Sequence, residues 1–115
     1  MRAYLIVSSV CVLALLLAAC TQAPQQAPDC SASAQWRAGL ERRLPEPACT
    51  EAAAREAHLL GTELAGLREE FEALGERIAN AAEADAAALQ RRQRQLQIDI
   101  EAIESEARVQ GWMQR

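Results

Sequence analysis

Two runs of apolar residues, spaced alternately four and three apart, occupy the second half of the chain. The first run consists of Leu60, Leu64, Leu67, Phe71, Leu74 and Ile78. The second consists of Leu89, Gln93, Leu96, Ile100, Ile103 and Ala107, and only Gln93 is polar. Residues with this spacing lie on one face of an α-helix, and the alternation is the a/d pattern of a coiled coil. The sequence therefore predicts an all-α fold with two long helices.

The two stripes can be buried in two ways. If the chain turns between Asn80 and Asp85, the helices pair antiparallel, and every layer from Ile78–Leu89 to Leu60–Ala107 shares one register. If it does not turn, one helix over residues 50–110 would be about 90 Å long and would need partner chains. Residues 81–88 contain no Gly or Pro, which favours the continuous helix. We expect the antiparallel hairpin, because it gives a single chain its own core.

The flanking positions of this antiparallel register bring like charges together. The expected pairs are Glu63–Glu106, Glu70–Asp99 and Arg77–Arg92. On a wet surface each would cost only about 0.2–0.5 kcal/mol. A buried Leu or Ile contributes about 1.5–3 kcal/mol, so the apolar layers outweigh the repulsion.

A short helix is expected ahead of the long ones, over residues 33–44, with Ser31 or Ser33 as its N-cap. One face of it would carry Trp36, Leu40 and Leu44. Pro45 and Pro47 would end it, because proline disfavours helix at the residue before it. The long helices are expected over residues 50–79, with Thr50 as N-cap, and 86–110. Residues 30–115 would thus form one small helical domain.

The first twenty residues have the layout of an export signal. Arg2 precedes an apolar run from Leu5 to Ala19 that only Ser8 and Ser9 interrupt. A single positive charge followed by such a run is typical of a secretory signal peptide. The run is too short to span a bilayer comfortably, which takes about 20 residues.

The run ends in Leu17-Ala18-Ala19-Cys20, which resembles the lipobox of bacterial lipoprotein precursors. The resemblance covers residues 1–20. It implies a diacylglyceryl group on the Cys20 sulfur, removal of residues 1–19, and acylation, for example by palmitate, of the new amino group. Thr21 stands where an Asp would imply retention in the inner membrane, so the resemblance implies the periplasmic face of the outer membrane. An ordinary signal peptide with a coincidental cysteine, or an uncleaved anchor, are the alternatives.

Two cysteines, Cys30 and Cys49, remain after such processing, because Cys11 is removed and Cys20 carries lipid. Exported compartments favour disulfides, and an even pair in a small chain predicts a bridge. It would close a loop of about 20 residues and contribute about 3 kcal/mol. A metal or redox pair is disfavoured, since there is no CxxC motif and the only histidine, His58, is distant. Residues 20–29 contain no large apolar side chain and are expected to form a flexible tether.

Little in the sequence indicates chemistry. We expect no catalytic set, no metal and no cofactor, and we interpret His58 as a surface or boundary residue of a helix. The glycines are scattered singly, so there is no phosphate-binding loop. A formal net charge of −4 gives no reason to bind nucleic acid.

A partner surface is the one remaining kind of site. Its candidate residues are Trp36, Gly61, Gly75, Arg91, Arg92, Arg94 and Trp112. The arginines form the only basic cluster and would contact an anionic headgroup or an acidic partner; a plain solvated helix exterior is the alternative. Small residues at 61 and 75 would let another element approach closely, either the Trp36 helix or a segment of a partner.

The leading hypothesis is a non-enzymatic outer-membrane lipoprotein that presents a helical module to a protein partner in the cell envelope. A pilotin-like or other assembly-accessory role is one option, because secretin pilotins are similarly small, helical and lipidated and often contain a disulfide; this resemblance is at the level of the fold and includes no shared motif. The chain departs from the murein-linked coiled-coil lipoprotein, because it contains no Lys for covalent attachment. A carrier or inhibitor that binds a small apolar ligand around Trp36, Leu44 and Trp112 is the alternative. An enzyme ranks last.

Overall fold

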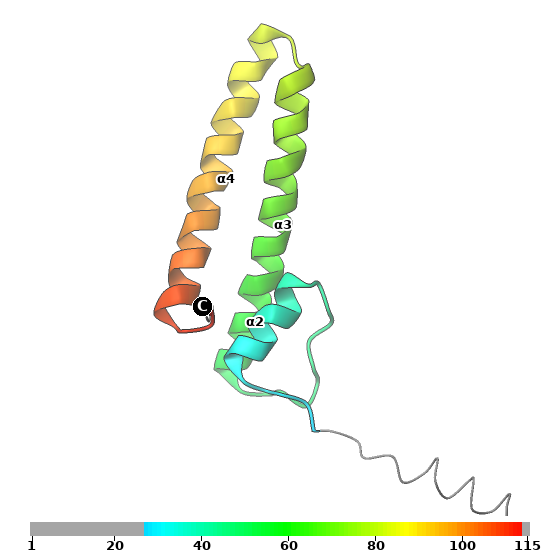
Figure 1. Ribbon diagram of the computed structural model, residues 1–115, viewed down its shortest axis with the longest axis vertical. Helices are drawn as coiled ribbons and strands as arrows, with labels where there is room; N and C mark the ends of the chain where they lie inside the picture. The colour runs from blue at the N-terminus through cyan, green and yellow to red at the C-terminus, as the bar shows by residue number, and fades with distance from the viewer. Residues whose placement is uncertain (1–26, 114–115) are drawn as a thin grey trace, which may run out of the picture.

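The computed structural model describes residues 27–113. They form three helices, α2 (Ala32–Leu40), α3 (Ala52–Asn80) and α4 (Glu83–Val109), and contain no strand (Figure 1). The predicted all-α class is confirmed. The expected signal peptide (residues 1–19), the lipidated Cys20 and most of the expected tether lie outside the described residues. Between residues 27 and 113, no helix is both long enough and apolar enough to cross a membrane.

The two long helices lie side by side and are joined by Ala81 and Ala82 (Figure 1). Both alanines are extended, with ψ angles of 151° and 150°. The expected alternative of one continuous helix is therefore not formed. Alanine is the best helix former, so packing of the two stripes outweighs local propensity at this point.

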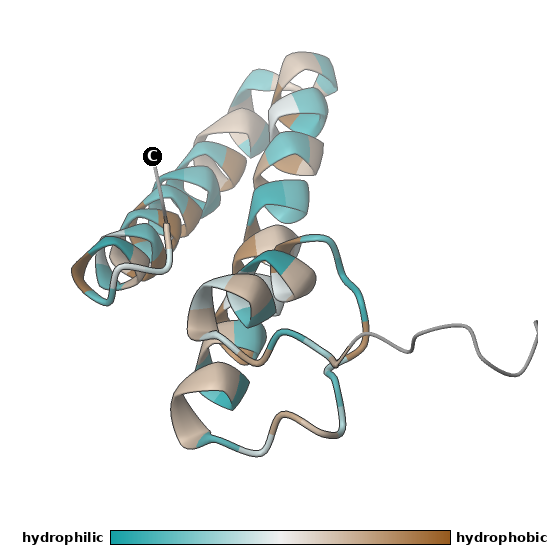
Figure 2. Ribbon diagram, turned by 60° about the horizontal axis from the view of Figure 1, so that its bottom comes forward, coloured by the Kyte–Doolittle hydropathy of each residue, from teal (hydrophilic) through white to brown (hydrophobic). Residues whose placement is uncertain are grey.

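The spacing of the apolar residues identified the buried face of each long helix correctly. All twelve residues of the two stripes are buried or half-buried, and Leu64 and Leu96 are fully buried. Leu59 and Ile98 lie off the stripes, and they are 66% and 59% exposed. Apolar and polar residues alternate along both helices accordingly (Figure 2). Gln93, the polar member of the stripes, has its Nε2 3.5 Å from the carbonyl oxygen of Phe71.

Glu70 and Arg92, each expected in a like-charge pair, instead form an ion pair with each other. Glu70 accepts hydrogen bonds from Nε and Nη2 of Arg92, at 3.1 and 2.9 Å. Arg68 donates to Glu104 at 3.0 Å. Each residue in these pairs has a side chain long enough to reach along the helix to the opposite charge. Because all four are partly exposed, each pair contributes only about 0.2–1 kcal/mol.

The short helix α2 ends at Leu40, four residues earlier than expected. Arg42 adopts a left-handed conformation, with φ 55°, and the N–H groups of Arg42 and Arg43 donate to carbonyls of the last helical turn. This is a Schellman ending, which satisfies carbonyls that a helix end leaves unpaired. Leu44 therefore does not share the buried face of Trp36 and is 90% exposed.

The expected N-cap of the short helix is confirmed at Ser31, whereas the starts of the two long helices differ from the expectation. Ser31 caps α2, with its Oγ accepting from the N–H of Ala34 at 3.2 Å. The N-cap of α3 is Glu51, not the expected Thr50, and its side chain makes no capping hydrogen bond. The N-cap of α4 is Ala82, so this helix begins at Glu83, three residues before the expected start.

Candidate functional site

The helix α2 crosses the first turns of α3 with the two backbones in contact. Both helices place a glycine at the crossing, Gly39 from α2 and Gly61 from α3, and both are buried. A Cβ on Gly61 would collide with the Trp36 carbonyl oxygen, and a Cβ on Gly39 would collide with the His58 carbonyl oxygen. The close approach that Gly61 predicted is thus made by the Trp36 helix and not by a partner.

Trp36 and Trp112 pack against each other next to this crossing. Their ring centroids lie 5.9 Å apart, with the planes tilted by 38°. Both residues are buried, and Ser33 of α2 donates from Oγ to the carbonyl oxygen of Gly111 at 3.4 Å. The chain reverses at Gly111, with φ 73°, where a second Schellman ending returns Trp112 onto Ala107. The pair is therefore part of the core rather than an exposed partner surface.

The apolar-ligand hypothesis required Leu44 to join these tryptophans. The hollow beside them measures about 240 Å³ and is lined by Trp36, Arg37, Leu40, Trp112 and Met113. Leu44 lines a different hollow, together with Pro28 and Asp29. Pockets for drug-sized ligands usually measure about 300–1,000 Å³, so this hollow offers such a ligand too little space.

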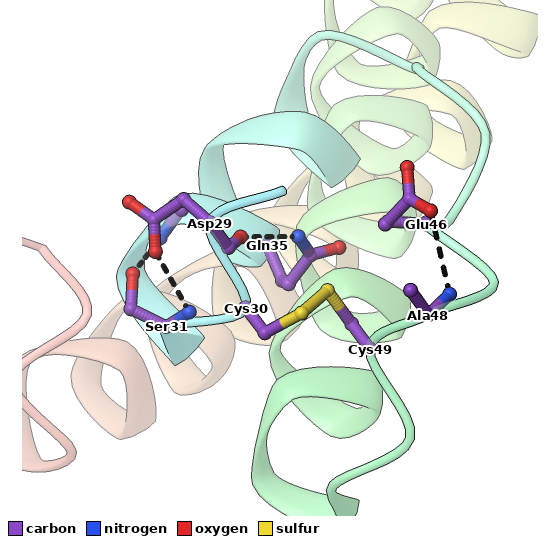
Figure 3. The surroundings of a disulfide bond; sticks show 8 residues. Asp29, Cys30, Ser31, Gln35, Glu46, Ala48 and Cys49 are labelled. Atoms are coloured by element: carbon purple, nitrogen blue, oxygen red, sulfur yellow. Dashed lines mark hydrogen bonds between the residues drawn. A yellow bond between two sulfur atoms is a disulfide. The ribbon is translucent and has the colours of Figure 1, made fainter. Parts of the chain in front are cut away.

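The predicted bridge between Cys30 and Cys49 is confirmed, with the two Cα atoms 5.1 Å apart (Figure 3). It ties the segment before α2 to the segment before α3. The buried Gln35 lies beside it, and its Nε2 donates to the carbonyl oxygen of Asp29 at 2.9 Å. The cross-link and this buried hydrogen bond hold the beginning of the described chain to the fold.

The Asp29 carboxylate also helps to begin α2. Its Oδ1 accepts from the Ser31 N–H at 2.9 Å. Hydrogen bonds from the Ser31 backbone and then from its side chain lower the pKa of Asp29 below the ordinary 3.8, and the positive charge of Arg37 acts in the same direction. The carboxylate is therefore favoured over the acid at this position.

The loop from Glu41 to Glu51 is fixed to α3 at several points. The Nε2 of His58 lies 2.8 Å from the carbonyl oxygen of Arg43, and because a carbonyl only accepts, Nε2 carries the hydrogen. Arg42 pairs with Glu69. His58, a half-buried residue of α3, thus has a structural contact that accounts for it.

The basic cluster is divided by the structure. Arg92 is engaged with Glu70, whereas Arg91 and Arg94 are exposed on α4. Ile98 is one helical turn beyond Arg94 and is also exposed. Gly75, the other predicted small position, has only the end of the Gln93 side chain near it. Of the candidate partner residues, Arg91 and Arg94 are exposed and have no hydrogen bond or ion pair with another residue between 27 and 113.

Sequence reasoning missed the core where α2 sits on α3. Ala54, Ala57 and Gly61 are buried there, in the same spacing of three and four that continues to Leu64. The signal was present, but alanines also fill the exposed faces of these helices, so composition concealed it. Pairing Gly39 with Gly61 as a helix crossing would have revealed it.

No cluster suited to metal binding is found in the described part of the chain. It contains no group of three His, Cys, Asp or Glu residues placed to hold a metal ion. Every buried side-chain nitrogen and oxygen between residues 27 and 113 has a hydrogen-bond partner. No protein-family model, no curated protein and no solved structure matches this chain.

Proposed function

We propose that the protein is a non-enzymatic lipoprotein of the bacterial outer membrane that holds a helical module on the periplasmic face. Cys20 carries the lipid anchor, and residues 20–29 connect it to the disulfide-bridged end of the fold. The observation that carries the proposal is the sequence Leu17-Ala18-Ala19-Cys20 directly after an apolar run. Two or more acyl chains hold a protein stably on a bilayer.

In this proposal α3 and α4 form an antiparallel, coiled-coil-like hairpin that reaches away from its anchored end. The 29 residues of α3 give a length of about 43 Å at 1.5 Å per residue. The ion pairs Glu70–Arg92 and Arg68–Glu104 support this pairing, since they join the helices at two heights. Small-angle scattering of the soluble fragment of residues 21–115 should give a particle about 45 Å long if the helices form the hairpin. A particle about twice as long would indicate an extended rod.

The outer face of α4 is the proposed surface for a protein partner in the envelope. Arg91, Arg94 and Ile98 follow one another at spacings of three and four, so they share one face, and all three are exposed. The other candidate residues, among them Trp36, Gly61 and Trp112, already have contacts within the chain. A partner that presents carboxylates around an apolar centre fits this face. The lipid confines this protein to the membrane surface where a membrane-associated partner also lies. This confinement raises the effective concentration of each for the other.

Anchoring is tested by Cys20→Ser in cells that express the full precursor. Mass spectrometry of the wild-type N-terminal peptide should show acylated Cys20 as the first residue, and the protein should float with outer-membrane vesicles. The variant should lose both properties. A wild-type protein that retains residues 1–19, or that carries a free thiol at Cys20, contradicts the proposal.

The partner surface is tested by cross-linking in intact cells. A photoreactive residue at position 98 should capture one membrane-associated protein, and Arg91→Glu with Arg94→Glu should abolish the capture. The control is Arg77→Glu, which reverses an exposed arginine on α3 and should leave the capture intact. Equal loss in the control would show a general charge effect and would contradict a defined surface.

A further inference from the structure

Exposed apolar side chains gather where the bridged loop meets α3. Leu44 is the most exposed large apolar residue in the described chain, and Leu59 is exposed as well. Pro45, Pro47 and Leu59 line one hollow of about 560 Å³. We refer to Leu44, Pro45, Pro47 and Leu59 as the base patch.

The loop that carries most of the base patch is held at the surface by contacts near both of its ends. It is closed at one end by the Cys30–Cys49 bridge. Near its other end, Arg43 is held by the contact of its carbonyl oxygen with His58. These two restraints favour the observed position of Leu44 at the surface, where it is 90% exposed. Exposed apolar side chains that are held near one another in this way indicate a site of interaction.

The chain enters the fold beside the same patch. Leu44 lines a second hollow, of about 340 Å³, together with Pro28 and Asp29. Ala27 follows Cys20 by seven residues, which span at most about 25 Å when fully extended. A lipid on Cys20 therefore keeps the base patch close to the bilayer, whereas the Ala81–Ala82 connection lies at the opposite end of the long helices (Figure 1).

We propose that the base patch rests on the bilayer that holds Cys20, an inference that depends on the lipid anchor of the proposed function. Leucine and proline side chains would enter the boundary between headgroups and acyl chains. Arg55, which lines the larger hollow, would lie at the level of the lipid phosphates. Glu46 lines it too, but its Oε1 accepts from the Ala48 N–H at 3.3 Å.

A weak contact suffices for this arrangement. A short flexible linker gives its two ends an effective concentration of the order of millimolar. A patch of a few side chains, too small to bring a free protein to a membrane, is therefore occupied once the anchor is in place. The contact would keep the long helices from swinging freely on the tether, with Arg91 and Arg94 in the half of α4 that lies toward the Ala81–Ala82 connection.

The test uses the full processed protein, purified from membranes and reconstituted into vesicles of phosphatidylethanolamine and phosphatidylglycerol. A fraction of the lipid carries a photoactivatable group on its acyl chain. After illumination, cleavage at arginine separates residues 44–55, 56–68 and 95–108. Lipid adducts should appear in the first two peptides, which contain Leu44 and Leu59, and be absent from the third, which contains the comparably exposed Ile98.

A second measurement adds single substitutions with a fluorophore. Bimane on Leu44→Cys and on Leu59→Cys should be quenched by nitroxide lipids several-fold more strongly than bimane on Ile98→Cys. The melting temperature of each labelled variant confirms that the Cys30–Cys49 bridge has not exchanged. Because the adducts are mapped on the unaltered protein, a misfolded variant leaves the first measurement decisive.

Different failures have different meanings. If the protein floats with the vesicles but its adducts and quenching are equal at Leu44, Leu59 and Ile98, the inference is wrong and the proposed function stands. The same holds if the loop is captured by a protein in cells and gives no adduct in vesicles. If Cys20 carries no lipid and the protein does not float, both proposals fall.

Discussion

The two ends of the molecule are held together by different means. At the base, α2, the first turns of α3 and the residues after α4 meet through a disulfide, a crossing at glycines and a tryptophan pair. Toward the Ala81–Ala82 connection, α3 and α4 are the only described elements, and they are joined by side-chain layers and exposed ion pairs. Backbone contacts tolerate no added atoms, whereas side-chain layers adjust. The base is therefore expected to resist motion and to be sensitive to substitution, and the far end to be the reverse.

Removal of the disulfide should have the largest effect on this contrast. The bridge joins residues 19 apart, and the chain-entropy model gives it about 3 kcal/mol. Cys30→Ser with Cys49→Ser should lower the free energy of unfolding by about that amount in a denaturant titration. Hydrogen exchange should accelerate in α2 far more than in the middle of α3 and α4. An unchanged melting temperature, or equal acceleration in all three helices, would remove the distinction between the ends.

The same substitution at two glycines of α3 should have opposite effects. In Gly61→Ala the new methyl group meets the backbone of α2, so something must shift, which costs about 1–3 kcal/mol. In Gly75→Ala the methyl group lies 3.4 Å from the flexible end of Gln93, an ordinary contact. Alanine is a better helix former than glycine, so this variant should gain up to about 1 kcal/mol.

Paired thermal melts of the two glycine variants provide the measurement. Gly66→Ala is a further control, since its added Cβ would have only Arg42 Nη2 near it, at 3.8 Å. It should behave like Gly75→Ala. If all three variants change stability in the same direction, close backbone packing at the base is not what distinguishes the two ends.

The sequence predicted the long helices better than the base. Heptad spacing identified the buried positions because a helix in contact along its whole length repeats one face. Such periodicity identified Leu64 and Leu96 as core residues, and both are fully buried. The cysteine pair was predicted by a similarly local argument, from the number and context of the residues.

The rest depended on contacts that periodicity does not encode. Gly61 and Gly75 are two heptads apart and therefore occupy the same heptad position, yet α2 packs against Gly61 and not against Gly75. Leu44 fits the helical spacing of Trp36 and Leu40, but a left-handed Arg42 ends the helix before it. The break at Ala81 and Ala82 lies in residues that favour helix, so only packing of distant segments decides it. The sequence does not distinguish Arg91 and Arg94 from Arg92, because the ion pair of Arg92 depends on the position of Glu70 in the fold.

Helix capping offers a smaller test of the same contrast. At the base, Ser31 caps α2, whereas α4 begins at the far end with Ala82 and no capping side chain. Ser31→Ala should cost about 1 kcal/mol, and Ala82→Ser should gain a similar amount. Denaturant titration of the two variants, each compared with the wild type, gives both signs. A gain smaller than the loss would show that the Ala82 conformation does not suit a capping serine.

The titration of Asp29 should give the smallest effect, and it is confined to the base. Because its folded-state pKa is lowered below 3.8, the stabilisation that it provides is fully present above that value. It is lost as the pH falls through the lowered folded pKa, since the acid form accepts less well from the Ser31 N–H. Nuclear magnetic resonance of the carboxyl carbon should place the midpoint below the ordinary value in the wild type. Ser31→Ala should raise the midpoint only part of the way, because the backbone N–H, the larger cause, is retained. A midpoint in this variant as high as in the unfolded chain would contradict this order of causes. It would show that the Ser31 side chain, and not its backbone N–H, lowers the pKa of Asp29.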